Sequence, residues 1–144
     1  MAAFLPDTSC MIAAVCSWHE HHERAALAIE RRLNRKESMV VAAAALVEAY
    51  SVLTRLPAPH RLSPADALSL VEANFMQSAK VAILQAEDYR ALLCGAPSAG
   101  ISGGRIYDAI IATCARTEDV STLLTFNDSH FRSLVGPDIA VLVP

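Results

Sequence analysis

Two hydrophobic patterns alternate along the chain. Short apolar runs of strand length lie at residues 2–5, 38–42, 79–84, 121–126 and 139–143. Between these runs, apolar residues recur at helical spacing, as Leu46, Tyr50 and Leu53 do within residues 43–56. Apolar strands that alternate with amphipathic helices are typical of a parallel sheet covered on both faces. The pattern therefore predicts a three-layer α/β/α domain with a mostly parallel central sheet of four to five strands.

The first strand and the helix after it have recognisable boundary residues. Pro6 should end the strand, since proline cannot donate a hydrogen bond within a central strand. Thr8 or Ser9 is then the expected N-cap of a helix that reaches about residue 17.

Later boundaries follow from proline and glycine. Ser63 and Pro64 fit the start of a helix that runs to about residue 75. A helix over residues 85–96 is expected to end at Gly95, so that residues 95–104, which hold four of the five glycines, form a flexible connection. No repeat or linker interrupts the pattern, and residues 1–144 are predicted to form one domain.

Composition narrows the class of protein. A hydrophobic fraction of 53% and a charged fraction of 19% describe a compact globule. The formal net charge of −3 argues against nonspecific nucleic-acid binding through bulk positive charge, although Arg31, Arg32, Arg35 and Lys36 form a local basic cluster. The longest apolar run, residues 39–47, is far shorter than the roughly 20 residues that span a bilayer. We expect a cytoplasmic protein without membrane association.

The cysteines are scattered without a CxxC pair. Cys10, Cys16, Cys94 and Cys114 all fall in or beside segments of helical pattern. We therefore expect reduced thiols within the core, not a zinc site or a disulfide framework.

Four acidic residues are predicted at one edge of the sheet. Asp7 follows the first strand, Glu48 lies early in the helix after the second, Asp108 lies in the first turn of a helix within residues 103–115, and Asp128 follows residues 121–126. Each has a structural explanation: Asp7 as a helix cap, Glu48 as a solvated helix residue, and the other two as favourable charges at helix N-termini. However, ligands of parallel sheets bind beyond the carboxyl ends of the strands, where these acids should converge.

Converging carboxylates suggest a metal-dependent reaction. They repel one another unless a cation neutralises them, and a set of oxygen donors suits Mg²⁺ or Mn²⁺. Such an ion can activate water and stabilise the charge that develops on a phosphate. The sequence thus predicts metal-assisted phosphodiester hydrolysis.

Five segments carry a family resemblance: "DTS" at Asp7, "HEHHERA" at residues 19–25, "VEAYSVLTR" around Glu48, "GGRIYDAIIATCA" around Asp108, and "LLTFNDSHF" at residues 123–131. In this order they resemble a PIN domain, specifically the VapC ribonuclease toxins of bacterial toxin-antitoxin pairs. The resemblance spans nearly the whole chain. It implies a PIN-like fold, Mg²⁺- or Mn²⁺-dependent cleavage of structured RNA such as tRNA or rRNA, a homodimer, and silencing by a VapB-type antitoxin.

The resemblance also implies roles for particular residues. Asp7, Glu48 and Asp108 match the three main metal-site acids, and Thr125 matches a hydroxyl beside that site. A fourth acid often lies two residues after the threonine, where this chain has Asn127. Either Asp128 replaces it through a small loop shift, or Asn127 serves as a neutral ligand or holds a water.

Further polar residues have weaker assignments. Ser102, Gly103 and Arg105 are expected to border the substrate phosphates. His19, His21 and His22 lack partners at zinc-finger spacing, so they are expected to form a polar helix start, with a position near RNA as a lesser alternative. His130 is expected on an exposed helix position.

Two other functions remain as alternatives. One is a noncatalytic PIN-like module that binds RNA or protein. The other is a phosphoaspartyl phosphatase or a receiver domain. The phosphatase would need a second acid where Ser9 stands, and the receiver would need a lysine that residues 123–131 lack.

Overall fold

The central sheet carries the predicted parallel architecture. The computed structural model describes residues 2–144, within which five strands pair in parallel in the order β3-β2-β1-β4-β5. Their bounds are β1 Ala3–Pro6, β2 Ser38–Ala42, β3 Lys80–Ala82, β4 Thr122–Leu124 and β5 Ala140–Leu142. The chain moves from β1 to one edge and then returns to build the other, which makes the carboxyl end of β1 a topological switch point.

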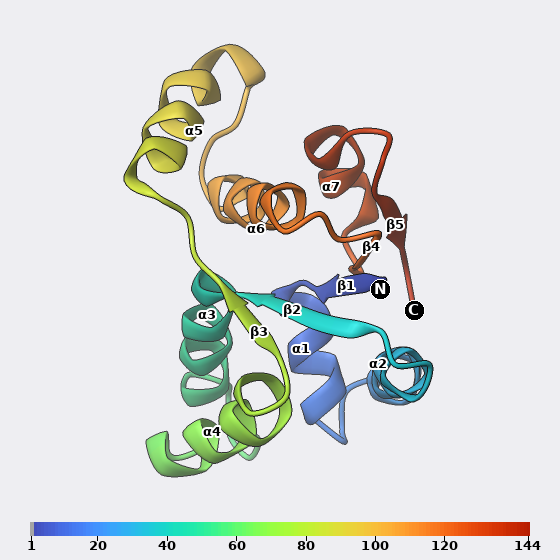
Figure 1. Cartoon of the computed structure of the whole chain (residues 1–144). Coiled ribbons are helices and arrows are strands. Elements are labelled where there is room, and N and C mark those ends of the chain that lie inside the picture. The colour runs from blue at the N-terminus through green and yellow to red at the C-terminus, as the bar shows by residue number, and fades with distance from the viewer. Residues whose placement is uncertain (1) are drawn as a thin grey trace.

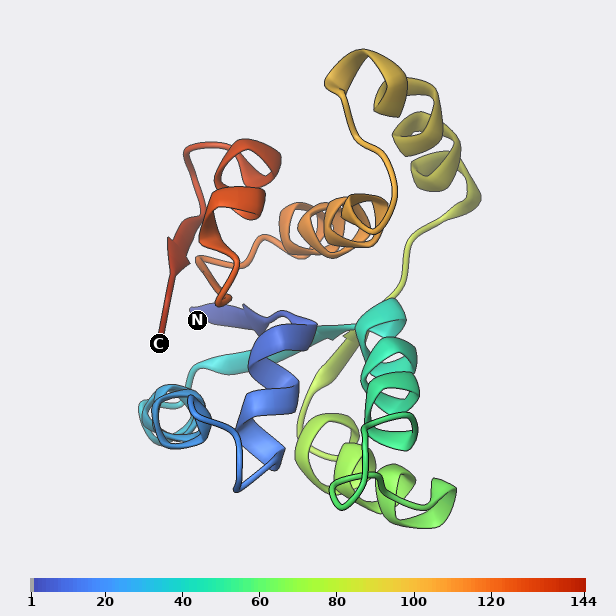
Figure 2. The same ribbon diagram turned by 180° about the vertical axis from the view of Figure 1, so that it is seen from behind.

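Helices cover both faces of this sheet. In Figures 1 and 2, α1 to α4 lie on one side of the sheet, α6 and α7 lie on the other, and α5 extends outward beyond α6. This three-layer arrangement confirms the predicted α/β/α fold. The helices are α1 Thr8–Val15, α2 His22–Asn34, α3 Ala43–Thr54, α4 Pro64–Val71 with the π-helical turn η1 Glu72–Met76, α5 Ala86–Ala99, α6 Arg105–Thr117 and α7 Asp128–Val135.

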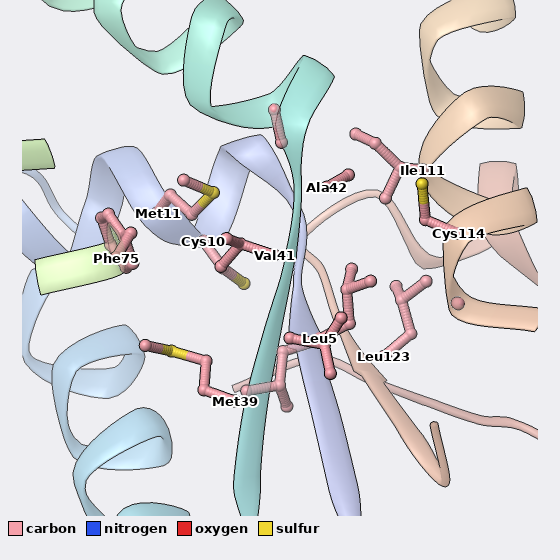
Figure 3. Packing of buried hydrophobic residues seen from close by; sticks show 14 of the residues in the cluster. Leu5, Cys10, Met11, Met39, Val41, Ala42, Phe75, Ile111, Cys114 and Leu123 are labelled. Carbon is pink, nitrogen blue, oxygen red and sulfur yellow. The ribbon is translucent and has the colours of Figure 1, made fainter. Parts of the chain in front are cut away.

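The core consists of two layers separated by the sheet (Figure 3). Side chains alternate between the faces of a strand, and Leu5 pairs in register with Leu123. These two leucines lie on the side of α6, whereas Val41 of β2 lies toward α1. The buried residues of the α1 side include Cys10, Met11, Met39 and Phe75, and those of the α6 side include Ile111 and Cys114.

Of two predicted boundaries near the N-terminus, one is confirmed and one is wrong. β1 ends at Pro6 as predicted, and because its pairing with β2 covers only Ala3 and Phe4, the missing N–H of Pro6 lies beyond that ladder. The N-cap of α1 is Asp7, not Thr8 or Ser9, since its carboxylate accepts a hydrogen bond from the amide of Cys10.

The predicted end of α5 at Gly95 is also wrong. The helix continues to Ala99 and ends at Gly100, whose φ of 69° is left-handed. There the amide of Ile101 bonds back to the carbonyl of Ala96 and closes the helix. A helical glycine costs only about 1 kcal/mol, so Gly95 does not suffice to stop the helix.

The cysteine prediction holds for three residues and fails for one. All four cysteines are free thiols, and Cys10, Cys16 and Cys114 are buried, but Cys94 is exposed on α5. In the part of the chain that the structure describes, none of the helices is long and apolar enough to cross a membrane.

Candidate active site

Asp7 is the most buried acid of the site. It follows β1 directly and is 2% exposed, and its backbone amide donates a hydrogen bond to the carbonyl oxygen of Leu124 in β4. Oδ1 accepts hydrogen bonds from Ser9 Oγ at 2.6 Å and from the Cys10 amide at 3.0 Å. Oδ2 accepts one from Thr125 Oγ1 at 2.6 Å. These bonds fix the carboxylate in one orientation, so Asp7 is a helix cap as well as a site residue.

The surroundings of Asp7 make its negative charge costly. Burial raises the pKa of its carboxyl above the usual value, and the hydrogen bonds from Ser9, Thr125 and Cys10 lower it only in part. The negative charge of Asp108 raises the pKa of Asp7 further. A cation beside these two acids would remove both penalties.

A cleft of about 420 Å³ brings the predicted residues together. Asp7, Glu48 and Asp108 all line it, from the end of β1, from α3 and from α6. Glu48 and Asp108 are partly exposed, unlike Asp7. The convergence expected at the carboxyl edge of the sheet is therefore present for these three acids.

The segment after β4 carries the two candidates for a fourth site residue, Asn127 and Asp128. Thr125 is fully buried, and its Oγ1 accepts a hydrogen bond from the Asn127 amide at 2.8 Å while donating to Asp7. Asn127 lines the cleft. Asp128 does not line it, and its carboxylate instead accepts a hydrogen bond from Arg132 at 2.9 Å along α7. This hydrogen bond lowers the pKa of Asp128.

The three residues expected to border the substrate phosphates lie outside the cleft. Ser102 and Gly103 precede α6 and Arg105 is its first residue; all three are exposed, and none lines the cleft that holds Asp108. Their role stays a prediction. His130 of α7 is exposed as predicted, and its Nδ1 lies 3.3 Å from Asp108 Oδ2.

The cleft also contains residues that sequence reasoning did not assign to it. Ser9 accepts a hydrogen bond from the Phe126 amide at 3.1 Å, which ties the start of α1 to the segment after β4. The loop between α1 and α2 also lines the cleft, through His19, Glu20 and His21. The additional lining residues are Thr8, Ser9, Ile12, His19, Glu20, His21, Val52 and Phe126. The run of histidines was the available signal for this loop.

The donor chemistry of the cleft fits a divalent cation. Carboxylate, amide and hydroxyl oxygens face it, and these are the ligands that Mg²⁺ and Mn²⁺ prefer. Thr8 Oγ1 is buried at the cleft and has no hydrogen-bond partner among residues 2–144. Over the same residues, no three His, Cys, Asp or Glu side chains are grouped closely enough to hold an ion as they stand. Because Asp7 is fixed, the partly exposed side chains of Glu48 and Asp108 would have to turn toward it for the three acids to hold an ion.

Comparison with known proteins identifies the class. The profile of the PIN domain matches residues 4–136. The chain therefore belongs to the PIN domain family, and its curated relatives are VapC ribonucleases.

Two of these relatives come from Mycobacterium tuberculosis. Ribonuclease VapC40 is 40% identical over 118 residues, which cover 82% of each chain. Ribonuclease VapC27 is 34% identical over 103 residues, which cover 72% of this chain and 62% of that protein.

Solved structures share the fold at low sequence identity. VapBC2 from Rickettsia felis, bound to a DNA fragment from its promoter, has a TM-score of 0.68 at 17% identity and covers 98% of both chains. Mycobacterium tuberculosis VapC20, a toxin that cleaves the sarcin-ricin loop, has a TM-score of 0.68 at 15% identity and covers 88% of this chain and 92% of that one. Both similarities concern the fold.

Proposed function

We propose that this protein is an Mg²⁺- or Mn²⁺-dependent endoribonuclease and the toxin of a VapBC-type pair. The observation that carries the proposal is the convergence of Asp7, Glu48 and Asp108 in one cleft at the carboxyl edge of the sheet. The 40% identity to ribonuclease VapC40 supports the same conclusion.

Asp7, Glu48 and Asp108 are the proposed ligands of the ion, and Asn127 completes the set through its amide oxygen or a held water. When bound, the cation would polarise a phosphate oxygen of the substrate and make a bound water more acidic. Asp7 contributes a fixed orientation, because Ser9, Cys10 and Thr125 hold both of its oxygens. Glu48 and Asp108 contribute charge that can adjust to the substrate. Asn127 takes the fourth position in place of Asp128, which is paired with Arg132.

The proposed substrate is structured RNA, of the tRNA or rRNA class, cut in the cytoplasm. A formal net charge of −3 is compatible with a small contact surface in which the ion and a few cationic side chains hold the phosphates. Arg105 and Ser102 are exposed beyond the cleft, so we assign them at most to phosphates away from the cut bond.

The proposed partners are a VapB-type antitoxin and a second copy of the chain. The Rickettsia felis neighbour, which is a VapBC complex, supports the proposed antitoxin. The homodimer face is proposed on α3 and α6, where Val47 is 71% exposed and Tyr107 is 54% exposed beside the same cavity. Large exposed apolar side chains of this kind are common at interfaces.

The experiment that tests the activity is the mapping of new RNA 5′ ends after brief induction in cells. Wild type should produce discrete new ends and inhibit growth, whereas Asp7→Asn should do neither at an equal protein level. Asp138→Asn, a change in an exposed acid that does not line the cleft, serves as the matched control and should behave as wild type. New ends that persist in Asp7→Asn, or purified activity that survives excess EDTA, would contradict the proposal.

A noncatalytic module is the second candidate. It is favoured only by the separation of the acids, since no group of three stands ready to chelate an ion within residues 2–144. Absence of Mn²⁺ binding by calorimetry, together with no cleavage of cellular RNA, would support this candidate.

A further inference from the structure

A continuous row of aromatic rings borders the acidic cleft. His60 stacks on Trp18 with ring centroids 4.1 Å apart, Trp18 lies 5.9 Å from His19, His19 lies 5.6 Å from His21, and His21 stacks on Phe126 at 4.6 Å. We call these five residues the aromatic rim. Three of them, His19, His21 and Phe126, also line the cleft, so the rim begins inside the site and leads away from it.

The rim is built from three separate parts of the chain. Trp18, His19 and His21 belong to the loop between α1 and α2, His60 lies in the connection between α3 and α4, and Phe126 follows β4. Local sequence pattern could not place these residues together. Their contacts arise from the fold, which brings the three segments together.

Core packing does not account for this arrangement. Trp18, the only tryptophan of the chain, is 46% exposed although it is stacked on one side by His60. A cation stands at the other end of the row, because the Arg24 guanidinium bonds to His21 Nδ1 at 2.6 Å and lies 5.6 Å from the centre of the Phe126 ring. One exposed ring in a row of partly exposed rings that ends at a cation offers what unpaired nucleic acid requires, namely stacking surfaces for bases and positive charge for phosphate.

The acidic cleft by itself provides little attraction for RNA, so an additional binding surface beside it is needed. Its carboxylates repel the phosphates of RNA wherever the cation does not neutralise them, and the formal net charge of −3 provides no general attraction. Stacking of bases on aromatic rings is independent of that charge. The rim therefore supplies binding energy where the cleft alone does not.

We propose that the aromatic rim binds unpaired nucleobases of the RNA substrate, with a base stacked on Trp18 and with Arg24 facing a phosphate of the same strand. This inference rests on the proposed function, because it takes RNA as the ligand. It extends that function by assigning recognition to an unpaired stretch beside the cut bond, such as a loop within a structured RNA. A continuous duplex would keep its bases stacked on one another and would not engage the rim.

Binding is measured apart from cleavage, in EDTA, by the fluorescence anisotropy of 5′-fluorescein-labelled single-stranded hexa-adenylate. The dissociation constant of Trp18→Ala should rise about ten-fold, the typical contribution of one stacked base. Trp18→Phe, which retains a ring, should remain close to wild type. Tyr89→Ala is the matched control, since Tyr89 is a similarly exposed ring on α5 and does not line the cleft.

A second readout uses Trp18 itself, because no other tryptophan contributes to the emission. Unlabelled single-stranded hexa-adenylate should quench the tryptophan fluorescence, and a blunt RNA duplex at the same nucleotide concentration should not. An unchanged dissociation constant in Trp18→Ala, no quenching, or no binding of the single strand to wild type would each overturn the proposal.

The outcomes separate this inference from the proposed nuclease activity. If wild type cleaves RNA in Mn²⁺ but wild type and Trp18→Ala bind hexa-adenylate equally well, the proposed nuclease function is supported and the role of the aromatic rim is contradicted. If wild type shows quenching and Trp18-dependent binding but never cleaves RNA, the role of the aromatic rim is supported and the proposed nuclease function is contradicted.

Discussion

The two walls of the cleft differ in how firmly they hold their acids. On one wall Asp7 is buried, and both of its carboxylate oxygens accept hydrogen bonds, from Ser9, Cys10 and Thr125. On the other wall Glu48 and Asp108 are partly exposed on separate helices, and the only contact of the Asp108 carboxylate with a side chain is a long one to His130 within residues 2–144. The comparison indicates one fixed acid facing two adjustable acids, and these three are the ligands that we propose. That difference explains why the acids line one cleft without forming a ready chelating group.

The largest effect is expected from the fixed wall. Asp7→Asn should abolish RNA cleavage, because it removes the charge that the cation needs while keeping most of the hydrogen-bond geometry. It should also raise the Tm of the metal-free protein at neutral pH, since burial makes the ionised carboxylate unfavourable. Cleavage assays and thermal melts of the same preparation measure both effects. A variant that is inactive and also much less stable would mean that Asp7 acts mainly as a helix cap.

Substitution of an acid on the adjustable wall should lower activity without lowering stability. Glu48→Gln should lower kcat/KM by about 100-fold, the usual size of a lost electrostatic contact in a transition state. Its Tm should stay near that of wild type because Glu48 is partly exposed. A drop in Tm as large as the drop in activity would show that Glu48 is structural.

Thr125→Val tests the support behind the fixed wall. Valine fills the same space but neither donates to Asp7 nor accepts from the Asn127 amide. Leaving these buried groups unpaired should cost about 1 to 3 kcal/mol of the free energy of unfolding. Loss of a residue that orients a metal ligand should lower Mn²⁺ affinity about ten-fold. Urea unfolding and calorimetry check the two values, and wild-type affinity would show that Asp7 does not depend on this hydroxyl.

The pH dependence follows from the raised pKa of Asp7. A proton competes with the cation for this carboxylate at a higher pH than for an ordinary aspartate. The Tm gain that Mg²⁺ gives wild type should therefore shrink as pH falls through the raised pKa of Asp7. In the metal-free protein the sign is opposite, since the raised pKa means that the contribution of Asp7 to stability improves as pH falls. Melts over pH 4 to 8 with and without Mg²⁺ test the sign, and Asp7→Asn should show neither trend.

The smallest effect should separate Asn127 from Asp128. Asn127→Ala should lower cleavage measurably, because Asn127 lines the cleft. Asp128→Ala should leave it unchanged, because Arg132 holds Asp128 along α7. The reverse order in side-by-side cleavage assays would show that the segment after β4 shifts to bring Asp128 into the site.

Sequence pattern predicted what depends on local periodicity and strand order. The parallel sheet, the helices on both faces and the meeting of Asp7, Glu48 and Asp108 all follow from apolar runs and from where each acid lies after a run. The end of α5 could not be predicted in this way. Gly95 lies within the helix, whereas Gly100 ends it by adopting a left-handed conformation, and local composition does not distinguish these two glycines. The contact of His21 with Phe126 did not follow either, because it joins segments brought together only by the fold.

The most direct test of the central claim is calorimetric titration of Mn²⁺ into wild type, Asp7→Asn and Asp128→Asn. The claim is that Asp7, Glu48 and Asp108 together hold the cation. It predicts saturable binding to wild type, the same affinity for Asp128→Asn, and no measurable binding to Asp7→Asn. Equal affinity of Asp7→Asn and wild type would contradict it.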